Sequence, residues 1–540
     1  MPETRGKQNY LHGAIILAIA TAMVKVIGAI YKIPLGNLLG GEGIGYFYTA
    51  YDIYTMLLTV STAGLPVALS KMIAESEVSG APGEQRRIFS VAVRAFAIIG
   101  LVGTALMFFL APQLAGDFMQ NSGAIPAVRS LAPAVFFVAL MAAFRGYFQG
   151  GSNMTPTAVS QVLEALCKLI VGFGLAWLMV SAGMGLDIAA SGAIIGVSLG
   201  TALGAGYLVF RYLRTSRRPR EDARQAQAKM RSHGRILKDL VKIAVPVSIG
   251  ASVLSIINLI DTALVLTRLQ SAGFSEEQAN FLYGAYSNTK TIFNLPAAFI
   301  VPLAVSIIPA ITTALAARDR KAVKRTAESS MRITALLAFP AGIGLLVLSW
   351  PILNLLFPAL EQEVEIGAPL LSMLGIAVMF ICIVLLTNAM LQGFGMVNVP
   401  VVTMAVGGAL KIVSNWVFVG NPDININGAP VGTLICYGTI AVLNMWCISR
   451  ALPHKISYLR IFARPLIAAA LMGGAAWATY GLLSMAVGAR VGIVIALLVA
   501  VAVYFLLVVM FRAIGYDDLV LLPKGEKIAK ILRITGQNEK

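Results

Sequence analysis

Apolar runs long enough to cross a membrane follow one another along the chain, with short polar segments between them. A helix needs about 20 apolar residues to span the hydrocarbon core of a bilayer. The pattern therefore predicts an all-α integral membrane protein with fourteen transmembrane helices. We place these helices near residues 11–33, 46–70, 88–111, 130–150, 157–182, 187–211, 237–267, 281–315, 331–356, 366–392, 397–419, 428–450, 462–483 and 489–512.

The composition agrees with this class. Of 540 residues, 58% are hydrophobic and only 12% are charged, whereas soluble domains carry about 25% charged residues. The four cysteines lie within apolar runs without a CxxC pair, and the three histidines lie far apart. These spacings predict neither disulfides nor a metal site, and we expect no cofactor.

The net charge of +17 is unevenly distributed. Lys and Arg crowd residues 212–236, residues 317–332 and the C-terminal tail, whereas residues 357–367 are acidic. Because cytoplasmic loops carry the excess of Lys and Arg in membrane proteins, this pattern predicts that both termini are cytoplasmic. We expect the basic loops to attract anionic lipids, and their positions argue against a nucleic-acid partner.

Two short motifs recur in the two halves of the chain. "PVALS" at 66–70 returns as "PLAVS" at 302–306, and a Gln stands 19 residues before a mid-helix Lys at both Lys168 and Lys411. These matches predict an internal duplication into two six-helix, pseudo-symmetric lobes, followed by two C-terminal helices. Parallel repeats of this kind are typical of transporters; the alternative is an old duplication in a protein with no transport cycle.

The repeat defines the predicted domains. The N-lobe covers the first six helices, a basic cytoplasmic linker divides the halves, and the C-lobe covers helices seven to twelve. Helices thirteen and fourteen and a cytoplasmic tail complete the chain. The boundaries are 1–211, 212–236, 237–450, 451–512 and 513–540.

Charged residues inside the predicted helices are the candidate functional residues. Such side chains cost about 2.5–3.5 kcal/mol each at the bilayer centre on insertion scales, and they usually face an interior or a water-filled cavity. Six cations stand against three anions. They are Lys25, Lys32, Arg145, Lys168, Lys290 and Lys411 against Asp52, Glu164 and Asp261.

Several of these residues have a structural interpretation. Glu164 and Lys168 are four residues apart, so they can neutralise each other on one helix face. Arg145 lies near the predicted cytoplasmic end of helix four and Lys32 near the outer end of helix one. Either side chain can extend to the lipid headgroups.

Lys25 and Lys290 are harder to explain structurally, because neither has an acidic residue within one turn in sequence. Asp52 is a candidate partner of a helix-one lysine, and Asp261 is a candidate counter-ion to Lys290 or part of a cation site. The surplus of positive charge favours an anionic ligand, because lysine binds phosphate as a point charge. We therefore expect the helix-one lysines to hold a phosphate-bearing headgroup within the membrane.

Several motifs of membrane enzymes are absent from the sequence. It contains no DxD, HExxH or Walker A motif, and no soluble domain is large enough to bind ATP. An active transporter of this kind would depend on an ion gradient or on the membrane potential, which supplies about 2.3 kcal/mol per charge per 100 mV. Na+ and H+ are the candidate coupling ions.

Four segments together carry a resemblance to a known family. They are "KVIGAIYKIPLGNLLG" (25–40), "AYDIYTMLLTVSTAGLPVALSKMIAE" (50–75), "FRGYFQG" (144–150) and "LPKGEKI" (522–528). The chain resembles the stage V sporulation protein B and YtgP-like polysaccharide-export family, over essentially its whole length. This family belongs to the multidrug/oligosaccharidyl-lipid/polysaccharide exporter (MOP) superfamily, which also includes the MurJ-type lipid II flippases.

The resemblance implies residue roles. MurJ-type proteins carry needed basic residues on helices one and eight, so it implies substrate-binding roles for Lys25, Lys32 and Lys290. Leu58 and Thr59 stand where MurJ-type proteins have basic residues late in helix two.

Some relatives bind sodium near helices seven and eleven, which implies Asp261 and Asn415 as cation ligands. We also place Asp52 and Arg145 in the substrate site.

The resemblance implies a flippase of the bacterial plasma membrane that moves undecaprenyl-diphosphate-linked oligosaccharides, lipid II first among them, by alternating access. We expect it to work as a monomer. One alternative is a sodium- or proton-coupled exporter of small organic cations or drugs. Another is a non-transporting scaffold in envelope or spore assembly. Of these alternatives, the sequence favours an enzyme least.

Overall fold

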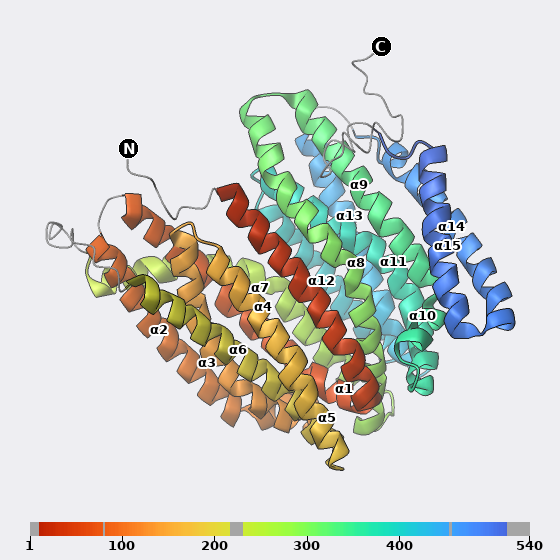
Figure 1. The fold of residues 1–540 in the computed structure, drawn as a ribbon, viewed down its shortest axis with the longest axis horizontal. Coiled ribbons are helices and arrows are strands. Elements are labelled where there is room, and N and C mark those ends of the chain that lie inside the picture. The colour runs from red at the N-terminus through yellow and green to blue at the C-terminus, as the bar shows by residue number, and fades with distance from the viewer. Residues whose placement is uncertain (1–9, 79–81, 217–230, 453–455, 516–540) are drawn as a thin grey trace. The chain divides into compact units, whose positions relative to one another are not determined.

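The computed structural model describes residues 10–78, 82–216, 231–452 and 456–515. Its regular elements in these ranges are all helices (Figure 1), so the predicted all-α membrane class is confirmed. Internal contacts divide the chain into two compact units, Met1–Ser287 and Asn288–Lys540. Most of the predicted linker 212–236 and of the tail 513–540, with the segment "LPKGEKI", lies outside the described residues.

The first unit contains seven complete α-helices and the start of an eighth. Shorter helical turns interrupt or connect them: η1 and η3 are π-helical and η2 is a 3-10 turn. The elements are α1 (Tyr10–Val78), α2 (Pro82–Phe109), η1 (Pro112–Phe118), η2 (Ser122–Ala124), α3 (Ile125–Gly150), α4 (Thr155–Cys167), η3 (Lys168–Gly172), α5 (Phe173–Ser181), α6 (Leu186–Ser216), α7 (His233–Ser271) and the beginning of α8 (Glu276–Ala316).

Predicted helices one and two both lie in α1, which consists of two helices joined across a kink at one residue. Gly40 has φ 62° and ψ −172°, and a helix continues on each side of it. Only glycine adopts this backbone conformation readily, because a Cβ would clash there. The connection between the two spans is therefore a kink at Gly40, and helical structure continues through residues 34–45, between the predicted ranges.

Predicted helix five is also interrupted within its span. The chain runs as α4 to Cys167, then as the π-helical turn η3 from Lys168 to Gly172, and then as α5. A π-helical turn adds a residue to the normal repeat and is frequent at functional sites. Lys168, a candidate charged residue, is its first residue.

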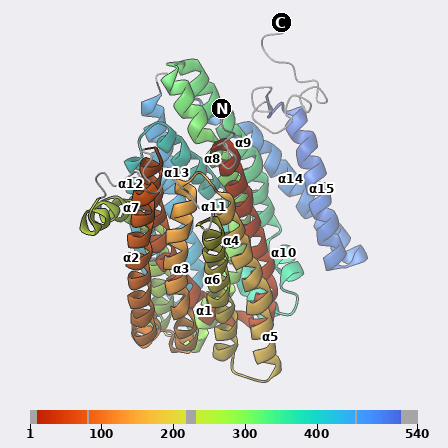
Figure 2. The ribbon, with the colours of Figure 1, turned by 60° about the vertical axis from the view of Figure 1, so that its left-hand side comes forward.

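The second unit continues α8 and adds seven further helices. In Figure 2, α14 and α15 stand side by side as a pair, and α14 also contacts α9. The elements after α8 are α9 (Arg320–Val347), α10 (Ser349–Leu356), α11 (Glu361–Gly393), α12 (Asn398–Phe418), the 3-10 turn η5 (Asn425–Asn427), α13 (Gly428–Ala451), α14 (Tyr458–Val487) and α15 (Ala489–Met510).

Within the described residues, twelve helical segments are long and apolar enough to cross a membrane. One of them, Ile19–Glu77, contains the break at Gly40 and supplies two of the predicted spans. The 39-residue helix α7 supplies another. This arrangement is consistent with the fourteen predicted helices.

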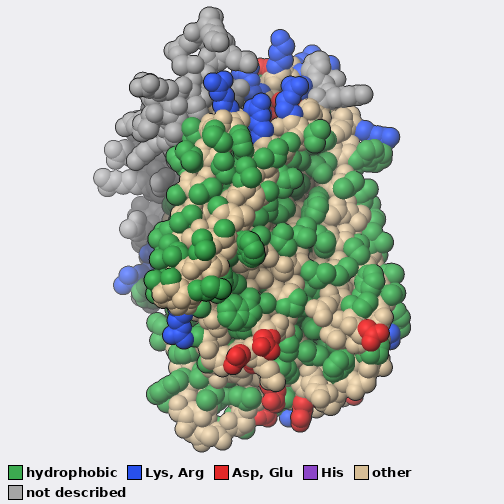
Figure 3. All heavy atoms as spheres, turned by 90° about the vertical axis from the view of Figure 1, so that its right-hand side faces the viewer, with side chains coloured by type: hydrophobic (Ala, Val, Ile, Leu, Met, Phe, Trp, Pro, Cys, Tyr) green, Lys and Arg blue, Asp and Glu red, His purple; other side chains and the backbone are tan. Residues whose placement is uncertain are grey.

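Charged side chains separate along the second unit. The helix α9 begins with Arg320, Lys321 and Lys324, whereas α11 begins with Glu361 and Glu363. Figure 3 shows Lys and Arg side chains gathered toward one end of the visible face, and Asp and Glu side chains toward the other. This separation follows the predicted division between basic and acidic loops.

The two compact units do not have the boundary of the predicted lobes. We placed the N-lobe at 1–211 and the C-lobe at 237–450, whereas α7 packs against α1 and α2 within the first unit. The division by contacts describes packing in this one conformation. The lobe boundaries, which rest on the internal repeat, stay a prediction.

Candidate functional site

The two lysines of the first half of α1 lie in different surroundings. The Lys25 side chain is exposed, whereas Lys32 is half-buried. The Lys32 Nζ lies 4.7 Å from the ring centroid of Tyr48 and 4.6 Å from that of Tyr51. An aromatic face attracts an ammonium group through its quadrupole and carries no net charge. The two rings therefore position the Lys32 ammonium without neutralising it.

Asp52 lies in the second half of α1, close to α7 and α8. Its Oδ2 accepts hydrogen bonds from Thr262 Oγ1 at 2.7 Å and from Tyr283 Oη at 2.8 Å. These two hydroxyls are 2.9 Å apart. Lys32 lies within electrostatic range of the Asp52 carboxylate. We expected a helix-one lysine as the partner of Asp52, and the structure adds two hydroxyls that tie α1 to α7 and α8.

Arg145, Glu164 and Lys168 form one buried charge cluster in which the single carboxylate faces two cations. The Glu164 Oε2 lies 3.5 Å from Arg145 Nη2, and its Oε1 lies 3.4 Å from Lys168 Nζ. Both Arg145 and Glu164 are 7% exposed. Because one negative charge faces two positive charges, the cluster keeps a formal charge of +1.

Further hydrogen bonds fix the cluster in place. The Tyr54 hydroxyl of α1 donates to Glu164 Oε1 at 3.0 Å, and Arg145 Nε donates to Ser160 Oγ at 3.2 Å. The Arg145 side chain therefore points between α3 and α4 and does not extend to the headgroups. A buried arginine of this kind needs its carboxylate, because an unpaired buried charge costs several kcal/mol.

A row of tyrosines on α1 connects the cluster to Lys32. Tyr48, Tyr51 and Tyr54 are three residues apart, which places them on one side of the helix. The ring centroids of Tyr51 and Tyr54 are 5.7 Å apart. The groups therefore make a continuous series of contacts, from Lys32 through the two rings to Glu164.

Asp261 is the remaining charged candidate of the first unit. It lies on α7 immediately before Thr262, and it is 4% exposed. Its role as a cation ligand stays a prediction. Within the described residues, no group of three or more His, Cys, Asp or Glu side chains lies close enough to hold a metal ion.

The second unit contains the other three candidates. Lys290 is half-buried on α8, and its carbonyl oxygen accepts a hydrogen bond from Asn294. Lys411 and Asn415 are both buried on α12, one turn apart. Gly432 of α13 packs directly against Asn415, because a Cβ at that position would overlap the amide oxygen. The shared site of Lys25, Lys32 and Lys290 stays a prediction.

Polar contacts that we did not predict join α1, the turn between η1 and η2, and α8 in the first unit. Asn121, between η1 and η2, donates to Thr49 Oγ1 at 2.9 Å and to Asn280 Oδ1 at 2.8 Å. Asn280 in turn donates to the carbonyl oxygen of Glu42 at 2.7 Å. Asn121 lies in a polar turn, and nothing in the sequence signals these partners.

A second unpredicted polar network lies in the second unit. Asn444 of α13 donates to Thr387 Oγ1 and Asn388 Oδ1 of α11, and it accepts from Thr403 Oγ1 of α12. The distances are 3.1, 2.7 and 2.8 Å. All donors and acceptors here are neutral, so the network fixes three helices and adds no charge.

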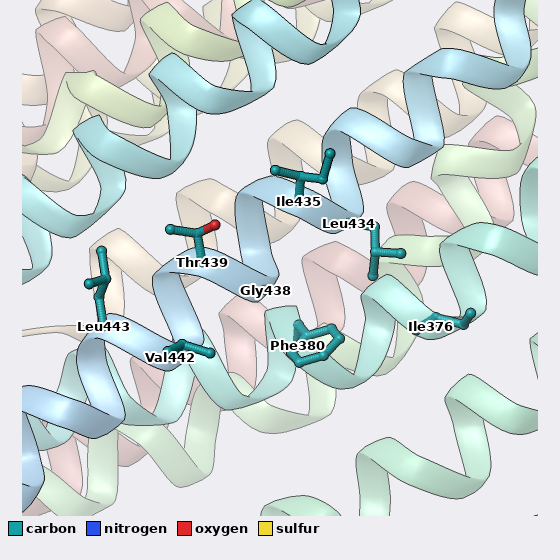
Figure 4. A pocket seen from close by; sticks show the side chains of 8 residues that line it. All are labelled: Ile376, Phe380, Leu434, Ile435, Gly438, Thr439, Val442 and Leu443. Carbon is teal, nitrogen blue, oxygen red and sulfur yellow. The ribbon is translucent and has the colours of Figure 1, made fainter. Parts of the chain in front are cut away.

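An apolar groove lies between α11 and α13 in the second unit (Figure 4). Phe380 and Val442 are among its lining side chains, and Thr439 contributes the only side-chain oxygen of the eight lining residues. The groove has a volume of about 580 Å³. Because it contains no charged side chain, it does not suit a phosphate group. The candidate headgroup residues lie elsewhere.

Comparison with known proteins places the chain in a family. The sequence profile of the family described as "Polysaccharide biosynthesis protein" matches residues 10–315, and that of the MatE family matches residues 283–417. In Bacillus subtilis (strain 168), the uncharacterized membrane protein YabM is 28% identical over 534 residues, which cover 97% of each chain.

Two further relatives from the same organism have informative names. Stage V sporulation protein B is 23% identical and matches 96% of this chain and 98% of its own length. The lipid II flippase MurJ is 24% identical over 421 residues, which cover 75% of this chain and 76% of the relative. These matches confirm the family that the sequence segments indicated.

Solved structures show the same fold. A lipid II flippase MurJ in an inward closed conformation matches with a TM-score of 0.70 and 14% identity, over 94% of this chain and 100% of that one. An inward-facing multidrug MATE transporter matches with a TM-score of 0.63 and 16% identity, over 80% and 98%. The chain therefore belongs to the polysaccharide biosynthesis protein family, has the fold of these flippases and transporters, and does not belong to a family of enzymes.

Proposed function

We propose that the chain is a flippase that moves an undecaprenyl-diphosphate-linked oligosaccharide, with lipid II the first candidate, across the bacterial plasma membrane by alternating access. The observation that carries this proposal is the position of Lys32. Its ammonium lies against two tyrosine faces, so it keeps its positive charge inside a membrane-length helix. A fixed cation at that depth is costly unless it serves an anionic ligand.

The charges of the first unit support an anionic cargo. Four cations stand against three anions, a difference of +1, and Lys25 and Lys32 both lie on α1. The charged residues counted are Lys25, Lys32, Arg145 and Lys168 against Asp52, Glu164 and Asp261. A diphosphate headgroup offers two phosphate groups to such a site. The MurJ relative is named a lipid II flippase, which makes lipid II the first substrate to test.

We propose the same orientation as the loop charges indicate, with the basic ends of the helices on the cytoplasmic side. The cargo would then enter at the basic end and leave at the acidic end. Asp261 is the proposed cation ligand for sodium or proton coupling, with Asn415 as a second one. Anionic lipids would gather at the basic loops, and a monomer suffices for this cycle.

The experiment measures lipid II on the outer surface of cells. In a strain without other lipid II flippases, depletion of this protein should lower the amount of lipid II that an external probe can reach. Wild-type protein should restore it, whereas Lys32→Gln and Lys25→Gln should restore much less. Lys324→Gln on α9 is the matched control, because it removes the same charge from a partly exposed i,i+4 pair with Glu328. Unchanged lipid II exposure after depletion would refute the lipid II assignment.

A cation exporter is the second candidate, since the MatE profile matches residues 283–417. Asp52 and Asp261 would then be the substrate-binding anions. This candidate predicts that the protein lowers the cellular accumulation of cationic dyes, and that Asp52→Asn abolishes the effect. The surplus of cations in the first unit disfavours it.

A further inference from the structure

Lys168 is the more exposed of the two cations that face the Glu164 carboxylate. Its side chain is 14% exposed, and those of Arg145 and Glu164 are each 9% exposed. The Oε1 atom accepts the Tyr54 hydroxyl at 3.0 Å, while the Lys168 Nζ lies 3.4 Å away. If Lys168 moved away, the carboxylate would keep Tyr54 and, at 3.5 Å, Arg145.

Lys168 and Lys32 are connected through the tyrosines of α1. The Lys32 ammonium lies 4.6 Å from the Tyr51 ring centroid, which is 5.7 Å from that of Tyr54. The Tyr54 hydroxyl and the Lys168 ammonium both contact Glu164 Oε1. Two like charges repel each other more strongly in a low-dielectric interior than in water. An anion between the two amines would convert this repulsion into attraction.

Lys168 lies where the helix changes its repeat. It is the first residue of the π-helical turn η3, and Gly172 at the end of that turn packs against the hydroxyl of Tyr31 on α1. The turn therefore brings η3 against the same segment of α1 that carries Lys32. Lys168 itself keeps α-helical backbone angles, so it faces Glu164 one turn before it, and the register shifts only for the residues that follow.

We propose that Lys32 and Lys168 form a two-cation site for a diphosphate group, in which Lys168 leaves Glu164 to bind one of the two phosphates. Glu164 holds Lys168 near Lys32 while no ligand is bound, and Arg145 and Tyr54 hold Glu164 in place. All three are positioning residues, because they do not contact the ligand themselves. The inference rests on the proposed function, which supplies a lipid-linked diphosphate as cargo. It adds the first residue of η3 to a site that sequence reasoning built from α1, α3 and α8.

A structural role makes a different prediction. If Glu164 and Lys168 only neutralise each other, Lys168 serves a diphosphate no better than a monophosphate, and its removal changes stability alone. If Lys168 binds the second phosphate, its removal lowers the preference for diphosphate over monophosphate. The ratio of the two affinities therefore separates the interpretations.

The test uses the purified full-length protein in nanodiscs, with undecaprenyl diphosphate and undecaprenyl phosphate as probes. Wild-type protein should bind undecaprenyl diphosphate at least about tenfold more tightly than undecaprenyl phosphate, as expected for one additional charge-assisted interaction. In Lys168→Gln that preference should fall to about twofold or less, while Lys168→Arg should retain most of it. Lys324→Gln, which removes a lysine from the partly exposed pair on α9, should leave the ratio unchanged.

Glu164→Gln provides a second test, because it should change the diphosphate affinity and the thermal stability in opposite directions. It removes the competing negative charge, so affinity for the diphosphate should rise while the thermal stability falls, because Arg145 loses its charged partner. If the Glu164 carboxylate has only a structural role, the substitution should lower both the affinity and the thermal stability. If this variant does not fold, the Lys168→Gln ratio still decides the question.

The outcomes separate the inference from the proposed function. Wild-type protein that binds neither lipid would refute both. Wild-type protein that prefers the diphosphate, with the same preference in Lys168→Gln, would refute the two-cation site alone. Inorganic diphosphate is the third probe: weak binding supports the lipid headgroup as ligand, and binding as tight as that of the lipid would overturn the lipid assignment.

Discussion

Asn121 and Asn280 are joined by a hydrogen bond of 2.8 Å between Nδ2 and Oδ1, although 159 residues separate them in the sequence. Both side chains are fully buried. The bond connects the turn between η1 and η2 to the start of α8, and Thr49 of α1 joins the same amide. These three residues, which we call the amide contact, lie at the end of the first unit that we assign to the outside.

The amide contact should stabilise the first unit in this conformation. Asn280→Ala removes one acceptor of the buried Asn121 amide, which keeps Thr49, and it removes the side-chain donor to the Glu42 carbonyl. Each hydrogen bond of this kind contributes about 0.5–1.5 kcal/mol. We expect a lower unfolding temperature and faster labelling of a cysteine placed at Ser122. Asn294→Ala is the control, because that amide bonds only within its own helix turn and is exposed. Equal labelling rates in the two variants would contradict the role of the contact.

Close packing of α1 against α8 should be intolerant of a methyl group. A Cβ at Gly284 would overlap the carbonyl oxygen of Gly41, and one at Gly45 would overlap Asn280. Overpacking of this kind costs about 1–3 kcal/mol, so Gly284→Ala should lower the unfolding temperature. Gly206→Ala on α6 is the matched control, since nothing lies within 4 Å of its added Cβ. That control should be neutral or stabilising, because alanine favours a helix.

The sequence predicted the helices better than the connections between them. Apolar runs of sufficient length determine where a helix crosses a membrane, so the spans agree closely with the elements. The absence of a loop around Gly40 depends on one backbone conformation that neighbouring residues do not encode by hydropathy. The π-helical turn at Lys168 has no hydrophobic signature either, since it changes the register and not the composition.

The candidate site was predictable as a set of residues but not as a set of partners. The spacing of Glu164 and Lys168 predicted their contact, because residues four apart share a helix face. Arg145 comes from another helix, so sequence spacing left open whether it would reach the headgroups. Its burial against Glu164 is a tertiary effect. The same holds for Asp52, whose partners Thr262 and Tyr283 lie more than 200 residues away.

The hydrogen bond from Tyr283 to Asp52 should contribute measurably to stability. Tyr283→Phe removes one donor to a carboxylate and leaves the Thr262 donor in place. Hydrogen bonds to charged groups contribute about 1.5–3 kcal/mol, so the unfolding temperature should fall by several degrees. Tyr207→Phe on α6 is the control, since its hydroxyl has no hydrogen bond among the described residues. A Thr262→Val, Tyr283→Phe double variant should lose more than either single variant, because Asp52 would then keep neither donor.

Arg231 should tie three helices together at the end of the first unit that we assign to the cytoplasm. Its guanidinium lies 3.0 Å from Glu84 of α2, 3.5 Å from Asp239 of α7 and 3.9 Å from Glu75 of α1. The Arg231 side chain is 33% exposed, so each pair contributes only about 0.2–1 kcal/mol. Salt screens such partly exposed pairs. Arg231→Gln should therefore lower the unfolding temperature at low ionic strength and much less at 1 M salt.

The control for Arg231 removes a neighbouring cation that belongs to one helix only. Lys71 pairs with Glu75 within α1 at 3.9 Å, and its side chain is 61% exposed. Lys71→Gln should leave the salt dependence close to that of the wild type, because it connects no helices. Combining Arg231→Gln with Glu84→Gln should cost less than the sum of the two single changes, since both remove the same contact. Strict additivity, together with an unchanged salt dependence, would show that Arg231 does not join the helices.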